Sequence, residues 1–183
     1  RGNRISETGV PEEIKSVMVQ NVRVSSEAQF ASRAVYYVGP FVNSGPIPPK
    51  VEQETTYTII WGIVNTSNTI QNGEVRATLP VYMKWYGSVS PSKEHITHNR
   101  NTNEIVWSTG EIPAGTGIGK PPREVAFQVV LTPSLSQVKT APALITGTVF
   151  IGLDAFTNAP LRREKPDVTT KLSTDPRAVD GSE

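Results

Sequence analysis

The chain has 183 residues, with 18 Lys and Arg against 17 Asp and Glu, 37% hydrophobic residues and no cysteine. The balanced charge argues against nucleic acid as a partner, and the missing cysteine excludes disulfides, thiolate metal sites and thiol nucleophiles. No apolar run approaches the roughly 20 residues that span a bilayer. Because the chain starts at Arg1 and shows no signal peptide, we expect a fragment or processed product whose signal or membrane anchor lies outside it.

The two ends of the chain are polar and lack a hydrophobic period, which predicts a polar arm or linker over 1–13 and a linker over 174–183. Between them the dominant period is two, as expected for strands. We therefore assign 14–173 to a single β-sandwich domain. Residues 14–50 are either extra N-terminal strands of that domain or the tail of a preceding one.

The pattern predicts strands at 14–24 and 28–38, and then an extended, proline-rich connection. The segment 55–64 has apolar residues on both faces, which indicates a central strand. Further strands are expected, in chain order, at 74–79, 83–85, 95–98, 105–107, 124–132, 143–152, 156–161 and 168–172. Strands that recur every 10–15 residues or so, with turn signals between them, predict an all-β, immunoglobulin-like Greek-key sandwich of about seven to ten strands.

The segment 54–132 resembles the DUF11-type bacterial and archaeal surface repeat in the order and spacing of three motifs. The first is the strand and turn formed by TTYTI at 55–59 and VNTS at 64–67. The second is VRATLP at 75–80, and the third is IVWSTGEIPAG at 105–115.

This resemblance implies an immunoglobulin-like sandwich of envelope and S-layer-associated proteins, located at the cell surface, and it supplies no catalytic residues. The expected function is a non-catalytic extracellular structural or assembly module of a larger bacterial cell-surface protein. Its partners would be other protein domains or identical subunits, and the segment 14–24 is a candidate for donation between subunits. The alternative is an adhesion or carbohydrate-binding module with glycans as partners.

The sequence offers no constellation of catalytic or cofactor-binding residues. His95 and His98 are the two histidines of the chain, and on a strand they fall on opposite faces, where they cannot share a metal ion. The chain has no Gly-x-Ser-x-Gly nucleophile motif. The glycines of 115–120 do not match the spacing of a phosphate-binding loop, and Pro121 and Pro122 block the helix that such a loop needs.

Aromatic residues give the one candidate contact surface. Trp61 and Trp107 lie among residues of core parity, so we expect them in the core. Tyr82 and Tyr86 have the opposite parity to Trp85. If this pair faces solvent, the two tyrosines are the predicted contact with a ligand or partner.

Two kinds of covalent or metal chemistry remain open at this point. Asp154, Asn158 and Asp167 offer hard oxygen ligands for calcium at an end of the sandwich, although turn formation accounts for Asp154 equally well. An isopeptide bond between Lys and Asn, as in some pilin-like sandwiches, requires a buried pair that the sequence does not identify.

Overall fold

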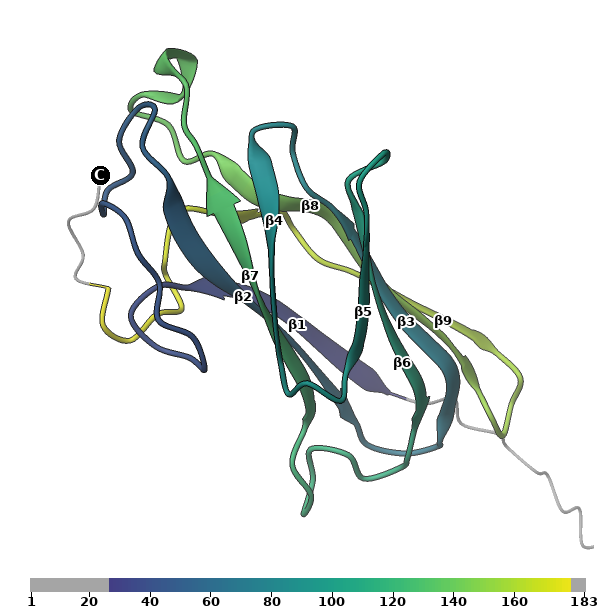
Figure 1. Cartoon of the computed structure of the whole chain (residues 1–183). Coiled ribbons are helices and arrows are strands. Elements are labelled where there is room, and N and C mark those ends of the chain that lie inside the picture. Colours follow the sequence, from purple (N-terminus) through teal and green to yellow (C-terminus); the bar gives the residue numbers. More distant parts are fainter. Residues whose placement is uncertain (1–26, 179–183) are drawn as a thin grey trace, which may run out of the picture.

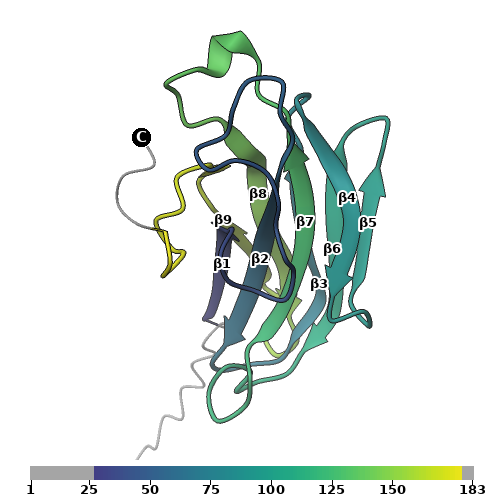
Figure 2. The ribbon, with the colours of Figure 1, turned by 60° about the vertical axis from the view of Figure 1, so that its left-hand side comes forward.

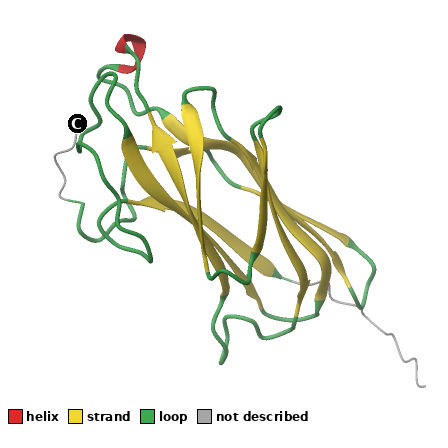
Figure 3. Cartoon of the chain, in the orientation of Figure 1, coloured by secondary structure: helices red, strands yellow, loops and turns green. Residues whose placement is uncertain are grey.

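The computed structural model describes residues 27–178, which form ten strands and one short 3-10 turn (Figures 1 and 3). The predicted arm at 1–13 and strand at 14–24 lie outside these residues. The elements are β1 (Ala28–Val35), β2 (Thr55–Asn65), β3 (Ile70–Thr78), β4 (Met83–Ser90), β5 (His95–Asn99), β6 (Glu104–Ile112), β7 (Arg123–Leu131), η1 (Leu135–Gln137), β8 (Ala143–Asp154), β9 (Pro160–Glu164) and β10 (Val168–Thr169). Within residues 27–178 no helix has the length and apolar character needed to cross a membrane.

The strands form two antiparallel sheets packed face to face (Figure 2). One sheet has the order β1-β2-β7-β4, and the other has the order β10-β8-β3-β6-β5 with β9 also paired to β8. The first order matches strands A, B, E and D of the immunoglobulin fold, and β3, β8 and β9 match strands C, F and G. The hairpin of β5 and β6 extends the second sheet on the far side of β3. The predicted Greek-key sandwich is therefore confirmed.

Large aromatic side chains fill the space between the sheets. Trp61 and Trp107 are fully buried, as predicted, and their rings stack with centroids 6.4 Å apart. Phe127 packs edge-on against Trp61 at 4.8 Å. The inward residues of β2 and β7 come from alternate positions of each strand, so the period of two decides which side chains reach the core.

The outer face of the first sheet is covered as well, by the connection between β1 and β2. Val38 and Phe41 pack against Val35, Ile60 and Ala126 on that face. The same connection also accepts a hydrogen bond from a polar side chain of the sheet, because the Gln128 side-chain amide donates to Val42 O at 3.2 Å. The strand 55–64 is central, and this cover buries its outer face from Thr56 to Ile60, whereas Gly62 and Val64 on the same face stay partly exposed.

Most strand bounds differ from the sequence prediction: β3 begins at Ile70 instead of 74, and the strand predicted at 156–161 forms at Pro160–Glu164. Two of the differences have a clear structural cause. The first strand ends at Val35 rather than at residue 38, because the amides of Tyr36 and Tyr37 turn to the carboxylate of Asp175. The last strand is Val168–Thr169 rather than 168–172, since the chain then turns back through Leu172 into the end of the sandwich.

Candidate functional site

The described residues contain no group of three or more His, Asp or Glu side chains placed to hold a metal ion. The three predicted calcium ligands do not form one site. Asn158 shares a turn with Asp154, and its amide donates to the backbone oxygen of Asp154 at 2.8 Å. Asp154 closes the turn after β8, where its Oδ1 accepts the amides of Phe156 and Thr157 at 2.8 Å. Asp167 instead accepts the amide of Gly147, about 23 Å back along β8 at the usual rise per residue. The turn role of Asp154 is thus the one that the geometry supports.

The two histidines lie on β5, as predicted, and face opposite ways. His95 is exposed, whereas His98 is half-buried and its ring stacks on Trp85 with centroids 5.8 Å apart. Burial lowers the pKa of His98; a hydrogen bond with Asn103 opposes this, and the charge of Arg100 adds a smaller lowering, so the stacked ring is neutral near pH 7.

The two candidate contact tyrosines have different surroundings. Tyr86 is 58% exposed, whereas Tyr82 is partly buried and packs against the core. Trp85 lies between them in the chain and fills the gap between His98 and Phe127. The region around β4 therefore presents a single open ring, that of Tyr86, at the edge of the first sheet.

No lysine in the described part of the chain is placed to form an isopeptide bond. Every lysine between residues 27 and 178 is exposed. The reaction requires an amine whose charge is removed by burial, and these amines are all solvated.

A buried carboxylate joins the two sheets at the loop between β4 and β5. Glu94 Oε2 accepts the indole N–H of Trp107 at 2.9 Å and two guanidinium N–H groups of Arg123 at 3.2 and 3.0 Å. Its side chain is 1% exposed. Trp107 belongs to one sheet and Arg123 to the other, so this carboxylate fixes the sheets at the point where the chain crosses between them.

A second carboxylate attaches the C-terminal segment to the end of β1. Asp175 Oδ2 accepts the amides of Tyr36 and Tyr37 at 2.7 Å each, and Oδ1 accepts the amide of Arg177 at 3.0 Å. Burial alone would raise the pKa of Asp175, but these amide donors outweigh it and lower the pKa. Sequence analysis assigns this region to a linker, whereas Asp175 is 4% exposed.

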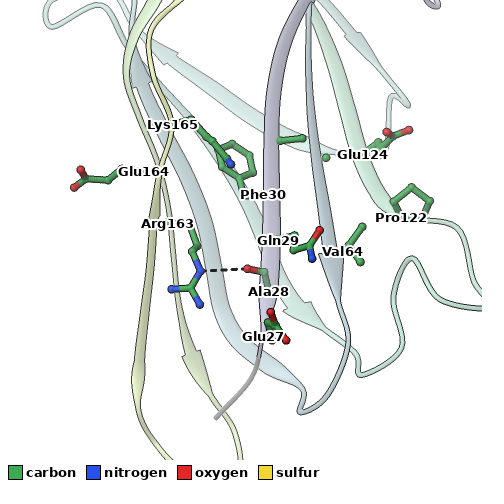
Figure 4. Close-up of a pocket in the computed structure, with 12 residues that line it drawn as sticks. Glu27, Ala28, Gln29, Phe30, Val64, Pro122, Glu124, Arg163, Glu164 and Lys165 are labelled. Carbon is green, nitrogen blue, oxygen red and sulfur yellow. Dashed lines mark hydrogen bonds between the residues drawn. The ribbon is translucent and has the colours of Figure 1, made fainter. Parts of the chain in front are cut away.

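The free edge of β1 borders a groove of about 630 Å³ beside β9 (Figure 4). Arg163 crosses the groove and donates to Ala28 O at 3.2 Å, and Thr174 donates to Ala34 O at 3.4 Å. In an antiparallel strand, every second residue directs both its N–H and its C=O to the same side. The main-chain groups of Phe30 and Ser32 therefore point to the same free edge as those of Ala28 and Ala34. No described residue forms a hydrogen bond with the main chain of Phe30 or Ser32 at this edge. A short part of the β1 edge is therefore unpaired.

No protein-family model matches the chain, and no curated protein matches it in sequence. Its structure is similar to that of BcpA, the major pilin subunit of Bacillus cereus, with 10% identity, a TM-score of 0.46, and coverage of 78% of this chain and 40% of the pilin. The full-length major pilin SpaD of Corynebacterium diphtheriae gives 13% identity and a TM-score of 0.47, covering 78% of this chain and 35% of that one.

A GH20 exo-β-N-acetylglucosaminidase of Vibrio harveyi also matches, with 9% identity, a TM-score of 0.40, and coverage of 82% of this chain and 19% of the enzyme. This chain spans less than half the length of each of these proteins. Likenesses at this level assign no activity to this chain. The DUF11-type resemblance stays a prediction from the sequence motifs.

Proposed function

We propose that this chain is a non-catalytic structural module of a cell-surface protein, carrying load between its two ends and contacting other protein domains or identical subunits. The observation that carries the proposal is the path of the chain. The described chain enters at the start of β1 and leaves near the opposite end of the sandwich (Figure 1). The length of β1 separates these points by about 23 Å.

The bonding at both ends makes this path suitable for bearing tension. Glu27 is tied to Thr66 and Ser67 at one end of β1, and Asp175 is tied to Tyr36 and Tyr37 at the other. A pull between 27 and 178 therefore acts along β1. It loads the continuous β1–β2 ladder in shear, so that its hydrogen bonds resist together.

Single-molecule stretching tests the load-bearing role. Attachments at residues 27 and 178 should give a distinctly higher unfolding force than attachments at 27 and 66. Residues 27 and 66 lie at the same end of the β1–β2 pair, so a force between them breaks the hydrogen bonds of the two strands one at a time. Equal or reversed forces would refute the role as a load-bearing module.

Location at the cell surface is supported by the DUF11-type motifs at 55–67, 75–80 and 105–115. Antibodies raised against residues 27–178 should label intact cells of the source organism without permeabilisation. Labelling that appears after permeabilisation alone would contradict a surface location.

Assembly of identical subunits would use the unpaired edge of β1. The alternating segment 14–24 of a second copy has the pattern of a strand that can add to such an edge. Light scattering over a concentration series should then show multimers of the full chain that disappear when residues 1–24 are deleted. Unchanged multimers in the deleted form would exclude this segment as the donor.

Glycan binding remains a second proposal because Tyr86 offers an exposed ring at the edge of the first sheet. A glycan array probed with the full chain should then give signals that Tyr86→Ala removes and that Tyr82→Phe retains. An array without signal would leave the structural role as the better proposal.

A further inference from the structure

The free edge of β1 is held by side chains at its two ends and is open between them. Arg163 of β9 donates to Ala28 O at 3.2 Å, and Thr174 donates to the last carbonyl of that row at 3.4 Å. The main-chain groups of Phe30 and Ser32 lie between these contacts, and no described residue bonds them at this edge. Each residue offers one N–H and one C=O, which is what one hydrogen-bonded pair of an antiparallel ladder uses. This open edge, the free main-chain groups of Phe30 and Ser32, therefore has the donors and acceptors to pair with a short strand.

A removable cover lies over the open edge. Phe30 is 3% exposed, so a strand reaches its main chain only after the side chains beside it move. Arg163 lies opposite Phe150 in the β8–β9 pair, and the Phe150 ring lies 6.0 Å from that of Phe30. Arg163 thus starts beside the open edge and reaches across the groove to Ala28 O (Figure 4). Its side chain is exposed, and turning it into solvent costs one hydrogen bond that water replaces.

The groove beside the open edge contains three carboxylates and two cations. Glu27, Glu124 and Glu164 are its acidic lining residues, and Arg163 and Lys165 are the basic ones. All five side chains are exposed, so each single attraction to a bound strand is weak. Their summed charge is negative, which favours a strand that carries positive charge and no acidic residues.

The alternating segment 14–24 has the matching charge and pattern. It contains Lys15 and Arg23 and has no Asp or Glu. Its even-numbered positions include Ile14, Met18 and Val22, so one face of the expected strand is largely apolar. Residues directly opposite each other in an antiparallel pair point to the same face of the sheet. The apolar face of this segment would therefore lie next to the inward side chains of β1 and continue the core.

The turn residues of the sequence favour a strand from a second copy over a fold-back of the same chain. If all of 14–24 folded back on its own β1, residues 25–27, with the sequence Ser-Ser-Glu, would have to form the loop. Hairpin loops of two or three residues need positive φ angles, which Gly, Asn and Asp adopt readily. In addition, the main chain of Glu27 bonds to Thr66 and Ser67 on the β2 side. Glu27 therefore continues the direction of β1 instead of turning back.

We propose that segment 14–24 of a second copy adds to β1 as an antiparallel strand at Phe30 and Ser32, with its even-numbered side chains facing inward, and that Arg163 restrains this pairing by holding Ala28 O. The inference rests on the proposed assembly role and deepens it, since it names the main-chain groups that pair, the orientation of the strand and the side chain that must first move. In the separate chain, Arg163 protects the edge from unselective pairing.

Fluorescence anisotropy of a labelled synthetic peptide with the sequence of residues 14–24 tests the orientation. The peptide is titrated with the full chain at concentrations where light scattering shows monomers. In the proposed pair, the inward-facing residues of the added strand direct their N–H groups to β1. N-methylation of both Met18 and Gln20 should therefore weaken binding about tenfold or more, because it removes hydrogen bonds of the ladder. N-methylation of both Val17 and Val19, whose N–H groups face away from β1, should change the affinity by less than about twofold.

A substitution of the restraining side chain gives the second test. Arg163→Ala should raise the affinity for the unmodified peptide about two- to fivefold, because it frees Ala28 O and removes the cover. Arg162→Ala is the matched control: this neighbouring arginine is equally exposed but donates to Glu164 instead of β1. The control should keep the affinity within about twofold of the parent chain.

Three results would overturn the proposal: undetectable binding to both the parent and the Arg163→Ala chains, equal binding of the two N-methylated peptides, or a lower affinity of Arg163→Ala. An equal gain in both arginine variants would replace the restraint by Arg163 with general charge repulsion of the peptide. Multimers that still depend on residues 1–24 would then keep the assembly role and reject β1 as its site. The stretching result is independent of all these outcomes, so the proposals can fail separately.

Discussion

Substitution of Glu94 by alanine removes the acceptor that joins the two sheets. The carboxylate oxygen holds the Trp107 indole at 2.9 Å and the Arg123 guanidinium at 3.0 and 3.2 Å. These two partners differ in their access to water. Trp107 is fully buried, whereas the Arg123 side chain is 38% exposed.

That difference sets the size of the effect. An indole N–H left buried without an acceptor costs about 1–3 kcal/mol. The Arg123 guanidinium can turn to solvent, and the lost ion pair, already screened by water, contributes about 0–1 kcal/mol. We expect Glu94→Ala to lower the free energy of unfolding by about 1–4 kcal/mol. Glu94→Gln keeps a carbonyl oxygen for the indole and should cost about 1 kcal/mol.

Urea unfolding followed by tryptophan fluorescence measures these differences, with Glu124→Ala on an exposed position of β7 as the control. The control should stay within about 0.5 kcal/mol of the parent chain. A glutamine variant as unstable as the alanine variant would show that the ion pair with Arg123 dominates, and the reasoning from Trp107 would be wrong.

Two further perturbations test the end of the sandwich. Because amide donors lower the pKa of Asp175 in the folded chain, its contribution to stability is complete above the pKa of the unfolded chain and is lost as pH falls through the lower folded value. Acid titration of stability should therefore show a loss below about pH 4 that Asp175→Asn reduces, and an identical acid profile in the variant would contradict this. Gly45 has φ +101°, and a Cβ there would lie 2.6 Å from Thr55 Cα, so Gly45→Ala should cost about 2–4 kcal/mol in urea unfolding. Gly119→Ala, at φ +68° with nothing within 4 Å, should cost about 1 kcal/mol, and equal costs would argue against the close approach at Gly45.

The strands and the core could be predicted because the signals for them are local. Alternation within β2 and β7 identifies the inward side chains from a window of a few residues. The two apolar faces of β2 also indicated a central strand correctly. The second reason for that pattern, a cover formed by Val38 and Phe41, lies in a proline-rich connection whose docking no local pattern encodes.

The polar residues that organise the ends of the sandwich could not be predicted, because their partners are distant in sequence. Tyr36 and Asp175 are 139 positions apart, and Glu94 and Arg123 are 29 apart. Asp175 lies in a stretch of polar and turn-forming residues whose composition is that of a linker. Only the folded structure shows that this stretch packs beside the end of β1. Tyr57 has the parity of a core residue, and the alternation correctly buries its ring but says nothing of its hydroxyl.

A cavity of about 1430 Å³ between 47–51, 133–142 and 170–178 follows from how this sandwich ends. Proline-rich connections cannot continue the sheet hydrogen bonds, so the segments around 47–51 and 133–142 leave the strands and enclose space instead of extending the ladder. Tyr57 of the core strand β2 lies beside that space, and both its ring and its hydroxyl are buried. Conversely, at the opposite end the side-chain amide of Asn65 donates to Asn68 O, Ile112 O and Pro113 O. The Asn65 Oδ1, like the Tyr57 hydroxyl, has no hydrogen-bond partner among the described residues, so each end of β2 keeps one buried polar atom unpaired.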